Sequence, residues 1–267
     1  ERRLAVFSAW LAGVGVLVGV DAFLVEPRWV EVTGTRVTSE KLHRPVKLVV
    51  IADLQTDHVG EYEAEVLRLA AAQDPDLVLF TGDYVQEPYE ERNAEERRKL
   101  NTLLRSLTWK PRLGMYAVRG DSDAEGWPDI FDGTGVVVLE STTTLRIGEL
   151  TLTGLDLETS RTRVLDLKPT DELHVVFGHA PDFALVPFPA DVLVAGHTHG
   201  GQVQLPLVGP LVTLTRVPRA WAAGRTDMPD GRTLLVSRGL GMERVAAPRL
   251  RFLCRPELMV VDLLPSS

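Results

Sequence analysis

Residues that can bind metal ions recur along this chain in short, glycine-rich contexts. They are the carboxylates of Asp53, Asp83 and Asp121 and the imidazoles of His179, His197 and His199. Mixed carboxylate and imidazole ligands suit Mn, Fe or Zn better than Mg or Ca. Two such ions can clamp a phosphoryl group and acidify a water molecule into a nucleophile. The pattern therefore predicts a centre with two divalent metal ions that cleaves a bond to phosphorus.

The run Gly-His-Thr-His-Gly-Gly-Gln at residues 196–202 holds two of the imidazoles. On an extended segment, His197 and His199 would point the same way because one residue separates them. The flanking glycines would let the backbone approach an ion closely. Taken singly, a Gly-Asp, a Gly-His or a His-x-His is often structural. The order and placement of all five motifs indicate a site.

The candidate ligands directly follow predicted strands. Dense apolar, β-branched runs predict buried strands, and periodic apolar residues among charges predict amphipathic helices. The strands are expected at 46–52, 77–80, 115–118, 173–177 and 192–195, and the helices at 62–73 and 91–107. Binding loops meet at strand ends in α/β sheets, so we expect these side chains to converge.

The order of the elements favours a layered α/β protein. Strands and helices alternate up to residue 118, as in α/β architectures. Further strands are expected at 143–147, 151–157, 234–237 and 258–264, with a turn at 148–149. We find no internal repeat.

The first 25 residues form a separate segment. An apolar run covers residues 4–20 and continues at 22–25 after Asp21, and about 20 apolar residues suffice to span a bilayer as a helix. We expect a transmembrane or signal-anchor helix at 1–25, a linker at 26–45 and one domain at 46–267. A cleaved signal peptide and a buried helix are the alternatives.

Composition excludes some partners and chemistries. The 267 residues carry a formal net charge of -8, which argues against broad nucleic-acid binding. The single cysteine, Cys254, cannot form an internal disulfide and lies in an apolar run typical of a core. Arginines outnumber acids over residues 216–255. This segment is either a solvated surface or a basic rim for an anionic substrate.

At the candidate ligands the sequence resembles the calcineurin-like metallophosphoesterase family. That family carries Asp-x-His, Gly-Asp, Gly-Asn-His, Gly-His and Gly-His-x-His motifs in this order, and the match covers 46–264. The run at 196–202 is similar to a bacterial branch of membrane-attached or exported phosphoesterases, some of which act on lipid-linked sugar nucleotides. The resemblance implies an α/β fold, a four-layer sandwich of two mixed β-sheets flanked by helices, preceded by the N-terminal hydrophobic helix.

The resemblance also implies which residues would bind each of two divalent metal ions. One ion would take Asp53, Gln55, Asp83 and His199, and the other Asp83, Asp121, His179 and His197. Asp83 would bridge the ions, and the catalytic core would consist of Asp83, Asp121 and His179.

Three positions depart from the family pattern. Gln55 stands where the family has His, and its carbonyl oxygen can still bind a metal ion. Asp121 stands where the family has Asn, and its extra negative charge should strengthen metal binding and weaken Lewis acidity. Ser122 replaces the His thought to protonate the leaving group. His58 could substitute, although it is also typical of a plain surface histidine.

These features predict a hydrolase of phosphodiester or pyrophosphate bonds. Without a strong proton donor at Ser122, activated substrates such as nucleotide-diphosphate conjugates or lipid-linked diphosphates are favoured. The alternative is a catalytically weakened or inactive binding module at the membrane. The resemblance implies a bacterial cell membrane, with the exported side favoured over the cytoplasmic one. The oligomeric state stays open.

Overall fold

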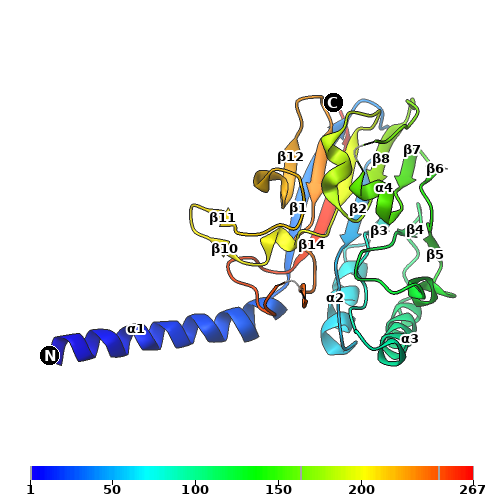
Figure 1. Ribbon diagram of the computed structural model, residues 1–267. Helices are drawn as coiled ribbons and strands as arrows, with labels where there is room; N and C mark the ends of the chain where they lie inside the picture. Colours follow the sequence, from blue (N-terminus) through cyan, green and yellow to red (C-terminus); the bar gives the residue numbers. More distant parts are fainter. Residues whose placement is uncertain (1, 163, 246, 267) are drawn as a thin grey trace.

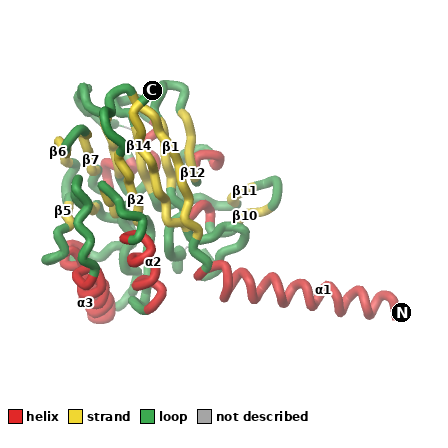
Figure 2. Tube along the Cα trace, turned by 180° about the vertical axis from the view of Figure 1, so that it is seen from behind, coloured by secondary structure: helices red, strands yellow, loops and turns green. Residues whose placement is uncertain are grey.

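Two six-stranded sheets form the body of the protein, and one long helix stands away from it. The computed structural model describes residues 2–162, 164–245 and 247–266. Figures 1 and 2 show the sheets lying side by side, with the helix α1 (Arg2–Val20) extending far from the body.

The first sheet has the strand order β1-β14-β2-β3-β4-β5. Its strands are β1 (Glu31–Ser39), β2 (Val46–Ile51), β3 (Leu77–Phe80), β4 (Met115–Ala117), β5 (Val136–Val138) and β14 (Glu257–Pro265). Strands β2 to β5 run parallel, so their carboxyl ends lie at one edge. Strand β14 is antiparallel to β2 and parallel to β1.

The second sheet has the strand order β12-β13-β9-β8-β7-β6. Its strands are β6 (Thr143–Ile147), β7 (Leu150–Gly154), β8 (Leu173–Phe177), β9 (Val192–Ala195), β12 (Gly224–Asp227) and β13 (Thr233–Val236). The four central strands are parallel, and the two edge strands are antiparallel to their neighbours.

Helices cover the outer faces of both sheets. The helices α2 (Glu61–Ala71) and α3 (Glu90–Ser106) lie on the first sheet, and the short α4 (Leu157–Arg161) and η4 (Pro181–Leu185) lie on the second. The smaller elements are η1 (Asp21–Val25), η2 (Glu26–Arg28), η3 (Trp127–Phe131), η5 (His199–Gly201), η6 (Arg219–Trp221), β10 (Gln204–Leu205) and β11 (Gly209–Pro210). The predicted fold of two mixed sheets flanked by helices is confirmed.

Three apolar clusters fill the spaces between these layers. Leu48 and Val50 of β2 face the second sheet, whereas Val49 and Ile51 face the helices α2 and α3. A strand buried on both faces needs a continuous apolar run rather than an alternating one. This explains why the central strands could be located from sequence to within a residue or two.

The predicted linker at 26–45 is wrong. Its residues form η2 and then β1, which pairs with β14 along all nine of its residues. Strand β1 is an edge strand in which only Val37 is buried, and its exposed positions are Val32, Gly34, Arg36 and Thr38. Polar, half-exposed strands lack the apolar run that marks a buried strand.

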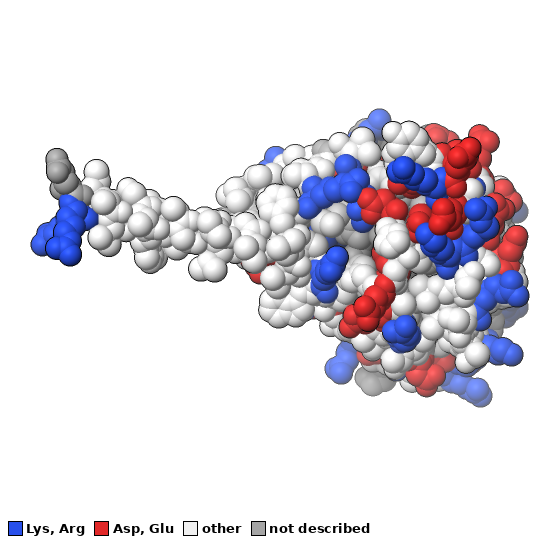
Figure 3. All heavy atoms as spheres, turned by 90° about the horizontal axis from the view of Figure 1, so that it is seen from below, with Lys and Arg blue, Asp and Glu red and all other residues white. Residues whose placement is uncertain are grey.

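A rigid junction joins α1 to the body. The carboxylate of Glu26 is buried and accepts hydrogen bonds from the backbone N–H groups of Leu253 and Cys254. The N–H of Arg251 donates to the carbonyl of Ala22 at 3.0 Å. The helix itself is exposed, and it is long and apolar enough to cross a membrane. Figure 3 shows it bare of charge except at its far end.

Because β1 belongs to the sheet, the start point of a shortened chain should decide its stability. A chain beginning at Glu26 keeps β1, and one beginning at Glu40 loses it. The shorter chain should lose at least about 3 kcal/mol of unfolding free energy, since each net backbone hydrogen bond is worth about 0.5–1.5 kcal/mol. Urea unfolding of both proteins checks this, and equal midpoints would contradict the assignment of β1.

Candidate metal centre

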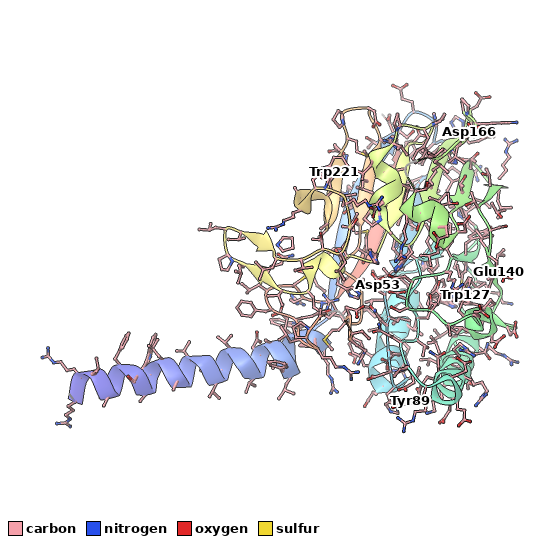
Figure 4. All side chains as sticks on the ribbon, viewed as in Figure 1. Asp53, Tyr89, Trp127, Glu140, Asp166 and Trp221 are labelled. Atoms are coloured by element: carbon pink, nitrogen blue, oxygen red, sulfur yellow. The ribbon has the colours of Figure 1, made fainter. Side chains whose placement is uncertain are left out.

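The strand ends of both sheets bring the predicted ligands to one place. Asp53 follows β2, Asp83 lies beyond β3, and His179 lies beyond β8. Asp121 follows β4, and the imidazoles at 197 and 199 follow β9. Figure 4 labels Asp53 where the strands of the two sheets end. Donor atoms form two groups that share His179, one with Asp53 and Asp83 and one with Asp121 and His197.

His179 lies at the centre of this arrangement and is fully buried. Its Nδ1 lies 2.9 Å from the carbonyl oxygen of Thr81, and its Nε2 lies 2.9 Å from Asp121 Oδ1. Asp83 Oδ2 is 3.5 Å from the same Nε2. A backbone carbonyl at one ring nitrogen is the usual support of a metal-binding histidine, because it holds the other nitrogen ready for the ion.

The other two imidazoles approach from a curled segment rather than an extended one. His197 and His199 have φ angles of 69° and 49°, so the expected extended His-Thr-His geometry is wrong. His197 directs Nδ1 at His179, 3.1 Å from its Nε2, and places Nε2 3.1 Å from the carbonyl of Leu214. His199 lies outside both donor groups, but its buried Nδ1 has no hydrogen-bond partner among the described residues.

Gln55 is held by groups that sequence reasoning missed. Its Nε2 donates to Ser122 Oγ at 3.0 Å and to Glu243 Oε2 at 2.8 Å. Its Oε1 is buried and has no hydrogen-bond partner among the described residues. The Ser122 hydroxyl in turn lies 3.2 Å from Asp83 Oδ2. Glu243 follows a Gly-Leu-Gly-Met run, and an acid there was the only sequence signal.

Asp123 is a second residue whose role the sequence did not reveal. Its buried carboxylate accepts hydrogen bonds from the backbone N–H groups of Asp83 and Gly120, both at 2.8 Å, and of Tyr84 at 2.7 Å. These bonds tie the loop after β3 to the loop after β4. Asp123 therefore fixes the position of Asp83 against that of Asp121.

A buried arginine binds the backbone of the loop that follows β13 of the second sheet. Arg251 is fully buried, and its guanidinium donates to carbonyls of Arg238, Gly239, Gly241 and Cys254. Gly239 has φ +70°, and a Cβ there would lie 3.0 Å from Asp53 Oδ2 and 3.3 Å from His199 Nδ1. Only glycine leaves both donor atoms room at this point.

Backbone strain is concentrated at the same place. Five of the seven predicted ligands have positive φ: Asp53, Gln55, Asp83, His197 and His199. Such conformations cost non-glycine residues on the order of 1–3 kcal/mol each and cluster at functional sites. These backbone conformations turn the side chains of the predicted ligands toward one another.

The buried charges of the centre shift each other's protonation. Burial raises the pKa of Asp53 to about 6, and burial raises the pKa of Asp83 well above its ordinary value. Burial opposes ionisation of Asp121, but hydrogen bonds from His179 and His197 outweigh it and hold that pKa well below its usual range. Burial alone would lower the pKa of His179, yet the carboxylates of Asp83, Asp121 and Asp53 raise it to about 10.

The other predicted contributors lie elsewhere. His58 is exposed and faces Glu96 of α3 at 3.8 Å. In the arginine-rich segment, Arg238 pairs with Glu31, and Arg251 is buried. The segment is therefore not one basic rim, although Arg216 lines a cavity beside Asp121 and His197.

Two cavities of different character open beside His197. A polar cavity of about 500 Å³ is lined by Arg161, Arg216 and Asp121. A mainly apolar cavity of about 330 Å³ is lined by Leu211, Val212 and Leu214 together with His199. A further cavity of about 530 Å³ near Trp109 contains none of the predicted ligands.

Fold and site together define a metal-dependent phosphoesterase architecture. The model of the calcineurin-like phosphoesterase family matches residues 46–201, so the chain belongs to that family, whose members use divalent metal ions. The resemblance inferred from the motifs is thereby confirmed.

Two curated relatives are similar over nearly their whole length. The uncharacterized metallophosphoesterase YkuE of Bacillus subtilis is 28% identical over 264 residues, covering 90% of this chain and 87% of its own. The phosphodiesterase YaeI of Escherichia coli is 27% identical over 249 residues, covering 89% and 90%.

Metal binding should displace protons from this centre. At pH 8 the metal-free His179 is protonated, because its pKa is about 10, and a histidine must be neutral to bind a metal ion. Titrating Zn²⁺ in buffers of different ionisation enthalpy should therefore give a release of at least about one proton per chain. The variant His174→Asn, which alters a buried imidazole of β8 outside the centre, should release the same number. An enthalpy independent of the buffer would refute the protonation of His179.

Proposed function

We propose that the chain hydrolyses phosphodiester or diphosphate bonds with the help of two divalent metal ions, Mn, Fe or Zn. Asp53, Gln55, Asp83 and His199 would hold one ion, and Asp83, Asp121, His179 and His197 the other. The observation that carries this proposal is the pair of donor groups around His179. They place the buried carboxylates of Asp53 and Asp83 close to the exposed carboxylate of Asp121, and this concentration of negative charge calls for compensating cations.

The unpartnered atoms of the centre support this assignment. Gln55 Oε1 and His199 Nδ1 are buried polar atoms without a hydrogen bond among the described residues. Such atoms are costly unless something occupies their lone pairs. The second nitrogens of His179 and His197 lie against the backbone carbonyls of Thr81 and Leu214. These contacts leave His179 Nε2 and His197 Nδ1 for an ion.

When bound, the ions would polarise the phosphoryl group and acidify a water molecule for attack on phosphorus. The protein's own contribution is positioning. Asp123 fixes Asp83 and Asp121 relative to one another, and Glu243 with Ser122 fixes the amide of Gln55. The polar cavity is lined by Arg161 and Arg216, and Arg161 also pairs with Asp121. Both arginines would attract an anionic substrate.

The leaving group receives little help from this centre. Ser122 Oγ accepts from Gln55 and lies within hydrogen-bonding distance of Asp83, and a serine hydroxyl is a weak acid near neutral pH. Good leaving groups such as phosphate anions need no strong proton donor. This favours a diphosphate over a simple alkyl diester as the substrate.

The cavities favour an amphiphilic phosphorylated substrate. The polar cavity suits phosphate or nucleotide, and the apolar cavity lined by Leu211 and Leu214 suits a hydrocarbon chain. Both border His197, so one molecule could occupy them together. A lipid-linked diphosphate has this character, and α1 would hold the enzyme at the bacterial membrane where such lipids reside, on the exported side.

Replacing Asp83 by Ala should empty the centre of both ions, because Asp83 would bridge them. Metal analysis after Mn²⁺ reconstitution should give two ions per wild-type chain and close to none for Asp83→Ala. The control is Asp76→Ala, which removes a carboxylate at the opposite ends of the strands, where it pairs with Arg112. Two ions retained by Asp83→Ala would refute the bridging role.

Introducing a proton donor should change the substrate preference. Wild type should cleave diphosphates faster than alkyl phosphodiesters, and Ser122→His should raise the alkyl rate by about tenfold or more, with a smaller gain on diphosphates. The control Ser122→Ala removes the contact with Gln55 without adding an acid. Equal gains on both substrates would show that protonation is not what limits the reaction. Metal binding without activity on either substrate would favour a binding module.

A further inference from the structure

An uncharged, largely apolar segment, residues 200–215, follows the last two candidate ligands, and we call it the arm. No acidic or basic residue occurs between His199 and Arg216. The arm contains the hairpin of β10 and β11, and large apolar side chains project from it into solvent. They are Leu205, Leu207, Val208, Leu211, Val212 and Leu214, of which Leu207 is completely exposed. Contiguous exposed apolar residues mark interaction surfaces in soluble proteins.

The arm points in the same direction as the candidate membrane helix. Figures 1 and 2 show the β10–β11 hairpin leaving the body on the side from which α1 extends. The junction at Glu26 fixes that direction, because its carboxylate binds two backbone N–H groups of the body. A bilayer crossed by α1 would therefore meet the hairpin before the rest of the domain.

We propose that the β10–β11 hairpin is a second membrane contact, whose Leu207 and Val208 enter the lipid interface of the bilayer that α1 spans. This surface is distinct from the metal chemistry, and it relies on α1 as the anchor. We assign lipid as the partner of the hairpin because the hairpin lies on the side from which α1 extends. A bilayer spanned by α1 would reach the level of the hairpin tip. A protein partner would need no such alignment.

Residues around the arm and the junction have the composition of a membrane–water boundary. Arg216 and Arg219 follow the uncharged run, are exposed and make no ion pair within the described part of the chain. Trp29, just after the anchor, is largely exposed, and the guanidinium of Arg255 lies 4.1 Å from its ring centroid. Basic residues attract anionic headgroups, and tryptophan prefers the headgroup level.

The contact would place the apolar cavity at the lipid surface. The segment after β11 supplies Leu211, Val212 and Leu214 to that cavity, and the carbonyl of Leu214 lies 3.1 Å from His197 Nε2. A hydrocarbon chain could then pass from the bilayer to the metal centre without exposing its apolar surface to water.

Depth-dependent quenching in vesicles tests the contact directly. The full chain is reconstituted in phosphatidylcholine–phosphatidylglycerol vesicles with an environment-sensitive fluorophore on one introduced cysteine. Leu11→Cys reports on α1, Leu207→Cys on the hairpin, and Val164→Cys on an exposed site near Asp166, which Figure 4 places away from α1. Native Cys254 is fully buried, so unmodified protein gives the labelling background.

Nitroxide lipids should quench the labels at 11 and 207 and leave the label at 164 unaffected. Quenching at 11 without quenching at 207 would overturn the hairpin contact and leave the anchor in place. Absence of quenching at both positions would overturn both.

An activity measurement separates this inference from the proposed function. The double variant Leu207→Glu and Val208→Glu should lower hydrolysis of a diphosphate lipid in vesicles by about tenfold, because charged side chains are unfavourable in the lipid phase. Hydrolysis of a water-soluble aryl phosphodiester should stay unchanged. An equal fall on both substrates would overturn the inference. Inactive wild-type protein would refute the proposed function, while the quenching would still decide the contact.

Discussion

Three carboxylates sharing one volume between the sheet ends impose the constraint that the rest of the centre satisfies. Asp53 and Asp83 are buried and Asp121 is more exposed, and the three cannot all be ionised so close together without cations nearby. In the metal-free protein the constraint is met by protons, because burial raises the pKa of Asp53 and the carboxylates raise that of His179. Parallel strands bring the loops to one edge, and left-handed residues there turn the side chains inward.

Sequence reasoning could place the candidate ligands close together because they follow the most recognisable elements of the fold. Strand β2 is apolar on both faces, so Asp53 could be placed at its end from the residues alone. The sequence of β1 predicts a linker because it has no continuous apolar run. Its partner strand, β14, lies at the other end of the chain. Glu243 and Asp123 could not be assigned either, since their roles depend on contacts with Gln55 and with backbone N–H groups of other loops.

Hydrogen bonds tie the candidate membrane helix to the domain. The α1 helix leads through η1 and η2 into β1, and Glu26 fastens this junction to the segment before β14. These contacts set how the domain is oriented relative to α1 in the structure. They thereby also set where the two cavities beside His197 lie relative to α1. The polar and the apolar cavity both border His197. The proposed substrate would place its phosphate group in the first and its hydrocarbon chain in the second.

The shared hydrogen bonds of Gln55 have an evolutionary consequence. Its amide donates to both Ser122 and Glu243, so a change at any one of these positions removes a hydrogen bond from at least one of the others. The ordinary His form of the motif would therefore be reached through intermediates that lack one of these hydrogen bonds. The three positions should consequently covary among relatives, as a single inherited unit. A lineage that acquired this unit would have been held to it by the cost of each single step back.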